Sequence, residues 1–158
     1  MQLNPHITFA LYFGTRGFFP EALIAGARQE LGAQVEKLGY GTLMMPADAT
    51  PHGAVESTAD GLKYAAWLAA HQGQFDGVIL CLPNFGDENG AVAALRDAGV
   101  PIFIHAYPDA LDKMDFSHRR DAFCGKLSIM DVFGQYGVPF SALQPHTVSP
   151  GSAEFATS

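Results

Sequence analysis

Short apolar runs alternate along this chain with segments whose apolar residues recur at helical spacing. The runs, which are typical of strands buried on both faces, cover residues 6–13, 41–46, 75–82, 102–106 and 140–143. The helical spacing lies between them, at residues 20–38, 57–71, 91–98 and 119–136. Parallel strands need a long crossover connection, which is usually a helix, whereas a tight hairpin joins antiparallel strands. Strands that alternate with helices along the chain therefore indicate a parallel sheet.

The alternation therefore predicts an α/β domain. We expect a doubly wound, flavodoxin-like, five-stranded parallel sheet with helices on both faces and the strand order 2-1-3-4-5. A chain of 158 residues fits one domain of ordinary size. We assign residues 1–144 to this domain. Residues 145–158 have little apolar periodicity and are expected to form a tail or the start of a linker to a missing domain.

Composition and charge exclude several classes of protein. Hydrophobic residues make up 48% of the chain and charged residues 16%, which is typical of a globular protein. No apolar run is long enough to span a membrane. The net charge of -7 repels phosphate backbones, so nucleic acid is not an expected partner. The N-terminus lacks the features of a secretory signal, and Cys81 and Cys124 have no disulfide or metal spacing, which favours a cytoplasmic protein with reduced thiols.

The loops after the predicted strands are the expected ligand sites, because open α/β sheets bind ligands at the carboxyl ends of their strands. Arg16 follows the first strand within Gly-Thr-Arg-Gly, beside a predicted helix start that favours an anion or an electron-rich oxygen. A solvated surface arginine is the alternative interpretation. The loop is not a dinucleotide fingerprint, because the third glycine and its spacing are missing.

The loop after the third predicted strand begins with Pro-Asn-Phe-Gly. The Asn84 amide could bond a sugar hydroxyl, and the Phe85 ring could stack on the apolar face of a sugar. Turn and core roles fit these two residues equally well. Asp87 and Glu88 suit helix capping or acid–base chemistry, and we favour capping.

Another group of polar residues follows the fourth predicted strand, in a long loop at residues 108–117. His105 and Asp109 could share a metal with Asp115 or His118, but the spacing matches no metal motif, and we favour a structural histidine. The chain has no Gly-x-Ser-x-Gly elbow, P-loop or Cys/His cluster. No self-contained catalytic set is therefore visible.

Segments spread over nearly the whole chain carry a family resemblance. They include Leu-Tyr-Phe-Gly-Thr-Arg-Gly-Phe-Phe and His-Arg-Arg-Asp-Ala-Phe-Cys-Gly-Lys, and they lie at residues 11–19, 82–86, 106–109, 113–116, 118–126, 135–137 and 145–148. Together they resemble the N-terminal domain of the L-fucose isomerase-like family and, more distantly, the L-arabinose isomerases.

The resemblance implies a ketol isomerase, which interconverts an aldose and a ketose by moving a proton between C1 and C2 through an enediol, or by a metal-assisted hydride shift. It also implies that the metal ligands and acid–base carboxylates lie in later domains of a protein several times longer. We thus expect no catalytic residue, metal site or cofactor in this chain, and Mn²⁺ in the full-length enzyme. These 158 residues alone should not isomerise sugars.

The expected role is that of a substrate-recognition and oligomerisation domain. In the family that this chain resembles, the N-terminal domain covers a neighbouring subunit's active site in a homo-oligomer and contacts the sugar. Carried over to matching positions, this implies substrate contacts from Arg16, with Asn84, Phe85 and Tyr107 as further candidates. The expected partners are a small-molecule sugar and other copies of the chain.

Two further functions are compatible with the sequence. One is a stand-alone flavodoxin-like module that binds a small ligand such as a sugar, nucleotide or flavin. The other is a domain that serves assembly alone, with interface anchors at Phe18, Phe19, Phe85 and Phe155. Ligand binding by the isolated chain would favour the first function, and self-association without ligand binding the second.

Overall fold

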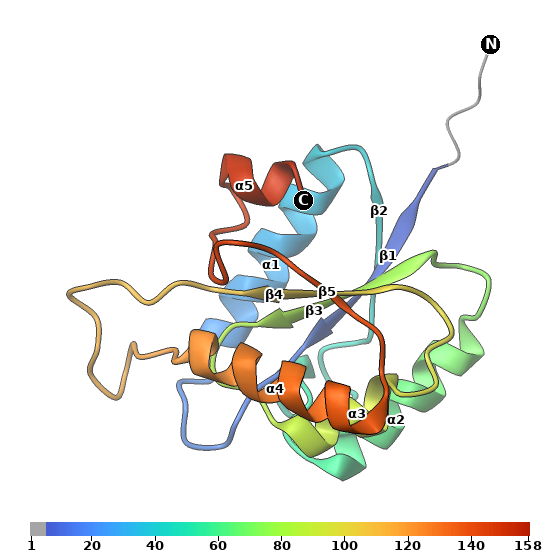
Figure 1. Ribbon diagram of the computed structural model, residues 1–158, viewed down its shortest axis with the longest axis horizontal. Coiled ribbons are helices and arrows are strands. Elements are labelled where there is room, and N and C mark those ends of the chain that lie inside the picture. The colour runs from blue at the N-terminus through green and yellow to red at the C-terminus, as the bar shows by residue number, and fades with distance from the viewer. Residues whose placement is uncertain (1–5) are drawn as a thin grey trace.

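A five-stranded, all-parallel sheet forms the centre of the computed structural model, which describes residues 6–158 (Figure 1). The strand order is β2-β1-β3-β4-β5. The strands are β1 (Thr8–Phe13), β2 (Gly41–Met44), β3 (Gly77–Leu82), β4 (Ile102–Ala106) and β5 (Ser141–Ala142). The predicted fold class and strand order are confirmed. Residues 1–5, on which the expectation about a secretory signal depends, lie outside the described residues.

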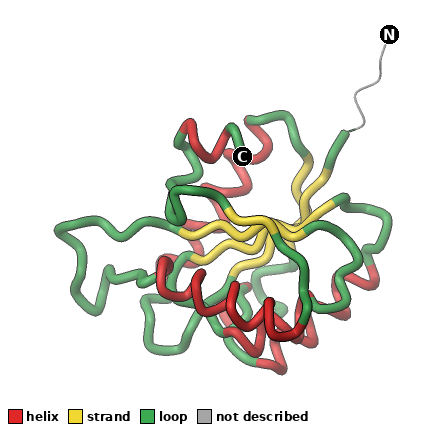
Figure 2. Tube along the Cα trace, in the orientation of Figure 1, coloured by secondary structure: helices red, strands yellow, loops and turns green. Residues whose placement is uncertain are grey.

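Helices cover both faces of the sheet, as Figures 1 and 2 show. One face carries α1 (Ala22–Lys37) and the short α5 (Ala153–Ala156). The other carries α2 (Thr58–Ala70), α3 (Glu88–Leu95) and α4 (Ala122–Tyr136), and a single 3₁₀ turn, η1 (Pro51–Gly53), precedes α2 in the chain. No helix within residues 6–158 is long and apolar enough to cross a membrane.

The two apolar cores follow from the period-2 alternation of side chains along each strand. In β1, Ala10 and Tyr12 pack into the core beneath α2, α3 and α4, whereas Leu11 and Phe13 pack beneath α1. All six residues of β3 are buried because this strand has helices on both faces and strands on both sides. Burying one such large apolar side chain stabilises the fold by about 1.5–3 kcal/mol.

Two helices begin three residues away from the start that the sequence pattern predicts. Helix α3 starts at Glu88 rather than at residue 91, because the Asp87 carboxylate caps it by accepting the Gly90 N–H at 2.7 Å. Helix α4 starts at Ala122 rather than at residue 119. The Asp109 carboxylate accepts the backbone N–H groups of Arg120 and Asp121 there, and Asp121 has a left-handed backbone with φ of 50°.

The segment after β5 packs against the sheet. Val148 and Phe155 are buried in the core beneath α1, and the Val148 N–H donates to the Ala106 carbonyl at 3.0 Å. The buried Lys126 ammonium donates to the carbonyls of Leu143 at 3.1 Å and His146 at 2.8 Å, which fixes the turn before that segment. That residues 145–158 also lead to a further domain stays a prediction.

Candidate functional site

The carboxyl edge of β1 and β3 is the switch point of this sheet. These two strands are neighbours, and the chain proceeds from β1 to β2 on one side but from β3 to β4 on the other. Loops that separate in this way leave a crevice, which is the usual ligand site of a doubly wound sheet. Residues 14–21 and 83–87 form the two loops at this edge, and the loop from β4 to α4 projects beside them (Figure 1).

Asn84 ties these two loops together. Its side chain is fully buried, and its amide donates to Thr15 Oγ1 at 2.8 Å. Its oxygen accepts the backbone N–H groups of Arg16 at 3.2 Å and Gly86 at 3.3 Å. With both ends of the amide engaged inside the protein, this geometry supports a positioning role for Asn84. Direct substrate contact by Asn84 stays a prediction.

Arg16 and Phe85 are brought together at this edge. The Arg16 guanidinium carbon lies 4.4 Å from the centre of the Phe85 ring, which is a cation–π distance. Arg16 also forms an ion pair with Glu88, whose other oxygen accepts the Ser128 hydroxyl. The Arg16 side chain is 32% exposed, so its guanidinium reaches solvent. Glu88 holds the guanidinium in place and partly neutralises its charge. Such a group suits a hydroxyl or carbonyl oxygen.

An aromatic stack extends from Phe85 toward solvent. The Phe85 and Phe19 rings are stacked with centroids 6.3 Å apart, and the Phe19 and Phe18 rings with centroids 4.7 Å apart. Phe18 is 72% exposed. We call Arg16, Phe18, Phe19, Phe85 and Glu88 the Arg16 cluster. Sequence reasoning took Phe18 and Phe19 only as interface anchors, although their position two and three residues after Arg16 could have placed them here.

Tyr107 lies in a second group, after β4. The side chain is buried, its hydroxyl donates to Glu30 Oε2 at 2.9 Å, and burial raises its pKa. The Arg120 guanidinium carbon lies 4.6 Å from the centre of the Tyr107 ring, and Arg120 donates to the Pro83 carbonyl at 2.8 Å. Sequence reasoning missed Glu30 and Arg120, because no local pattern connects α1 with this loop.

His105 has the structural role that the sequence favoured. The ring is buried, and Nε2 donates to the Val148 carbonyl at 2.7 Å. Asp109 is occupied by the backbone at the start of α4. Within residues 6–158 there is no group of three or more His, Cys, Asp or Glu side chains that could hold a metal ion.

We expect His105 to make the fold sensitive to acid. Burial lowers its pKa from 6.5 to about 4, so the folded protein keeps a neutral ring at pH values where the unfolded chain takes up a proton. The free energy of unfolding should therefore decrease by up to about 3 kcal/mol as the pH falls from 6.5 to 4. Urea unfolding at several pH values measures this decrease, which His105→Phe should reduce. An equal slope in the variant would contradict the expectation.

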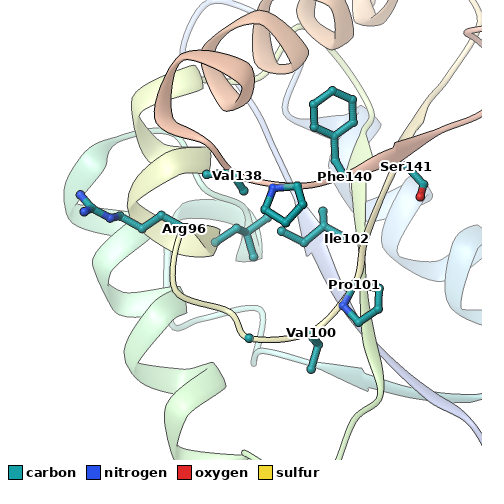
Figure 3. Close-up of a pocket in the computed structure, with 10 residues that line it drawn as sticks. Arg96, Val100, Pro101, Ile102, Val138, Phe140 and Ser141 are labelled. Atoms are coloured by element: carbon teal, nitrogen blue, oxygen red, sulfur yellow. The ribbon is translucent and has the colours of Figure 1, made fainter.

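A pocket of about 540 Å³ lies at the opposite end of the sheet (Figure 3). The turns before β4 and β5 form it, and Val100, Ile102, Val138 and Phe140 are among its apolar lining residues. Among the described residues that line it, Arg96 alone is charged, and its side chain extends away from Ile102 and Phe140 (Figure 3). Because this pocket lacks converging polar groups, we place the candidate site at the carboxyl edge.

The sheet and the helices on its two faces define a doubly wound α/β domain, a class that usually binds small ligands at its switch point. A family model described as "Fucose/sulfoquinovose isomerase, N-terminal domain" matches residues 10–158. The chain belongs to this family, as its resemblance to L-fucose isomerase-like proteins predicted. A comparison with curated proteins finds no match.

Proposed function

We propose that this chain recognises the sugar substrate of an aldose–ketose isomerase and takes part in its oligomer. Membership of the isomerase N-terminal domain family supports the reaction class. The observation that carries the recognition role is the contact between Arg16 and Phe85 at the switch point, where a cation and an aromatic face lie side by side.

The Arg16 cluster offers the two kinds of contact that a sugar requires. The guanidinium can donate to hydroxyl or carbonyl oxygens, and the exposed ring of Phe18 can pack against the apolar C–H face of the sugar. The ion pair with Glu88 holds the guanidinium in place before the ligand arrives, which lowers the entropic cost of binding. In this proposal, the acid–base groups and Mn²⁺ that act on C1 and C2 come from other domains of the enzyme.

We expect replacement of Arg16 to impair the whole enzyme. The protein should be expressed with the coding sequence downstream of Ser158 and assayed with Mn²⁺ on pentoses and deoxyhexoses. Arg16→Ala should lower kcat/KM by about ten- to a hundredfold, because one charge-assisted hydrogen bond contributes about 1.5–3 kcal/mol. Arg16→Lys should lower kcat/KM less than Arg16→Ala does, since lysine keeps the charge but not the planar guanidinium.

Arg96→Ala is the matched control, because Arg96 is an exposed arginine near the opposite end of the sheet. Its kcat/KM should equal that of the unchanged enzyme. If the enzyme without any substitution were inactive on every sugar of the panel, the isomerase function would be refuted. An active enzyme whose Arg16→Ala variant is equally active would refute the role of Arg16 alone.

The oligomerisation role is supported by the projecting loop between β4 and α4, visible in gold and orange in Figure 1. Leu111 is fully exposed, and Phe116 is 90% exposed. Exposed apolar side chains of this size are typical of contact surfaces. The loop lies on the same edge of the sheet as the Arg16 cluster, so a neighbouring subunit bound there would also cover the proposed sugar site.

Substitution of both Leu111 and Phe116 by aspartate should weaken the oligomer. Light scattering after size exclusion should show a lower mass, since two charges would be buried without partners in the interface. The free energy of unfolding of the protomer should change by no more than about 0.5 kcal/mol, because both side chains are exposed. An unchanged mass would place the interface elsewhere.

A further inference from the structure

A polar pocket of about 350 Å³ opens at the carboxyl end of β4, beside the N-terminal half of α1. Its volume falls within the range of about 300–1,000 Å³ that is usual for small-molecule sites. The residues that line it do not include Arg16, Phe85 or Glu88. Its polar and aromatic lining consists mainly of Glu30, Tyr107, Asp109, Lys113, His118 and Arg120.

Two cations supply hydrogen-bond donors to this pocket. Arg120 is fixed, because its guanidinium stacks on the Tyr107 ring at 4.6 Å and donates one N–H to the Pro83 carbonyl at 2.8 Å. A guanidinium has five N–H donors, so several remain for a ligand. Lys113 has no salt-bridge partner among residues 6–158, so its ammonium is also available.

Two carboxylates balance these cations. Both oxygens of Asp109 accept backbone N–H groups, at 2.7 Å from Arg120 and 3.1 Å from Asp121, so this side chain shapes the loop. Glu30 accepts the Tyr107 hydroxyl through Oε2, and its other oxygen has no hydrogen-bond partner within the described part of the chain. The lining therefore includes one unoccupied carboxylate oxygen as well as two cationic donors.

We propose that this pocket binds a neutral polyhydroxylated molecule, such as a monosaccharide or an alditol, at a site separate from the Arg16 cluster. His118 is paired with Asp115 at 2.9 Å, and the two cations and two carboxylates that remain in the lining sum to no net charge. A phosphate or sulfonate would face the free oxygen of Glu30 and the chain's net charge of -7, which disfavour an anion. Neighbouring hydroxyls can donate to that oxygen and accept from Lys113 and Arg120.

The test is a titration of the 158-residue chain with L-fucose, L-arabinose and their alditols, followed by NMR amide shifts. Inorganic phosphate and glucose 6-phosphate serve as anionic probes. Saturable shifts around Tyr107 and Arg120 are expected with at least one neutral probe. Lys113→Met and Glu30→Gln should each weaken that binding about tenfold, the loss of one hydrogen bond to a charged group.

Glu30→Gln removes the negative charge but keeps an oxygen that can accept the Tyr107 hydroxyl, so the hydrogen bond between Tyr107 and α1 is retained. Lys37→Met and Glu36→Gln, at the exposed C-terminal end of α1, are the matched controls and should bind like the unchanged chain.

Three outcomes would overturn the inference: no saturable binding of any neutral probe, tighter binding of the anionic probes, or unchanged binding in both Lys113→Met and Glu30→Gln. None of these depends on isomerase activity. If the titration shows no binding in the pocket, the isomerase assay still tests the proposed function. If the isomerase assay fails, the titration still tests the pocket.

Discussion

Substitution of Gly125 by alanine should destabilise the domain by more than about 3 kcal/mol, because the added methyl group would overlap the backbone of the loop after β3. The methyl carbon would lie 2.7 Å from Phe85 Cα and closer still to the Phe85 carbonyl group. Backbone atoms cannot move aside as a flexible side chain can. The first turn of α4 would have to move away from the loop that carries Asn84 and Phe85.

Gly134→Ala is the control within the same helix, where an added methyl group would meet no atom within 4 Å. It should stabilise the protein by about 0.5–1 kcal/mol, since alanine has the higher helix propensity. Urea unfolding followed by circular dichroism compares the two variants. Equal stability of Gly125→Ala and the unchanged protein would show that α4 does not pack against Phe85 this closely.

Loss of the Asn84 side chain should be the second large effect, with a cost of about 3 kcal/mol in the free energy of unfolding. In Asn84→Ala, three partners lose a hydrogen bond, namely the half-buried N–H of Arg16, the buried N–H of Gly86 and the buried Thr15 hydroxyl. Buried groups left without partners cost about 1–3 kcal/mol each, and partial relaxation offsets some of this.

The same variant should loosen the proposed sugar site before the domain unfolds. Amide hydrogen exchange at Arg16 and Gly86 should become faster, because Asn84 Oδ1 is the acceptor of both N–H groups. Asn89→Ala, an exposed asparagine in α3, should change the stability by less than about 0.5 kcal/mol. If both variants behaved alike, the two loops would be held together by other contacts.

The sheet could be predicted because its signals are local. A continuous apolar run such as β3 specifies a strand buried on both faces, and the alternation with helices leaves a parallel sheet as the compact solution. Helix starts were predicted less well. The start of α4 depends on Asp109, which lies 12 residues before Asp121 and whose carboxylate holds that N–H group.

The candidate site was predictable only in part. Arg16 and Phe85 could be selected because each follows a strand, and strand ends of a parallel sheet meet at one edge. Their mutual contact, and the support from Glu88, connect loops 68 to 72 residues apart in the chain. Asn84 could equally have pointed to solvent, and only its full burial indicates a positioning role.

The sequence by itself determined the class of fold and, through its resemblance, the isomerase family, because these depend on periodicity and on motifs that can be read along the chain. The tertiary structure alone decided which polar side chains are available to a ligand. Availability depends on hydrogen bonds between distant loops, which bury Asn84, occupy Asp109 and leave Arg16, Lys113 and one oxygen of Glu30 facing outward.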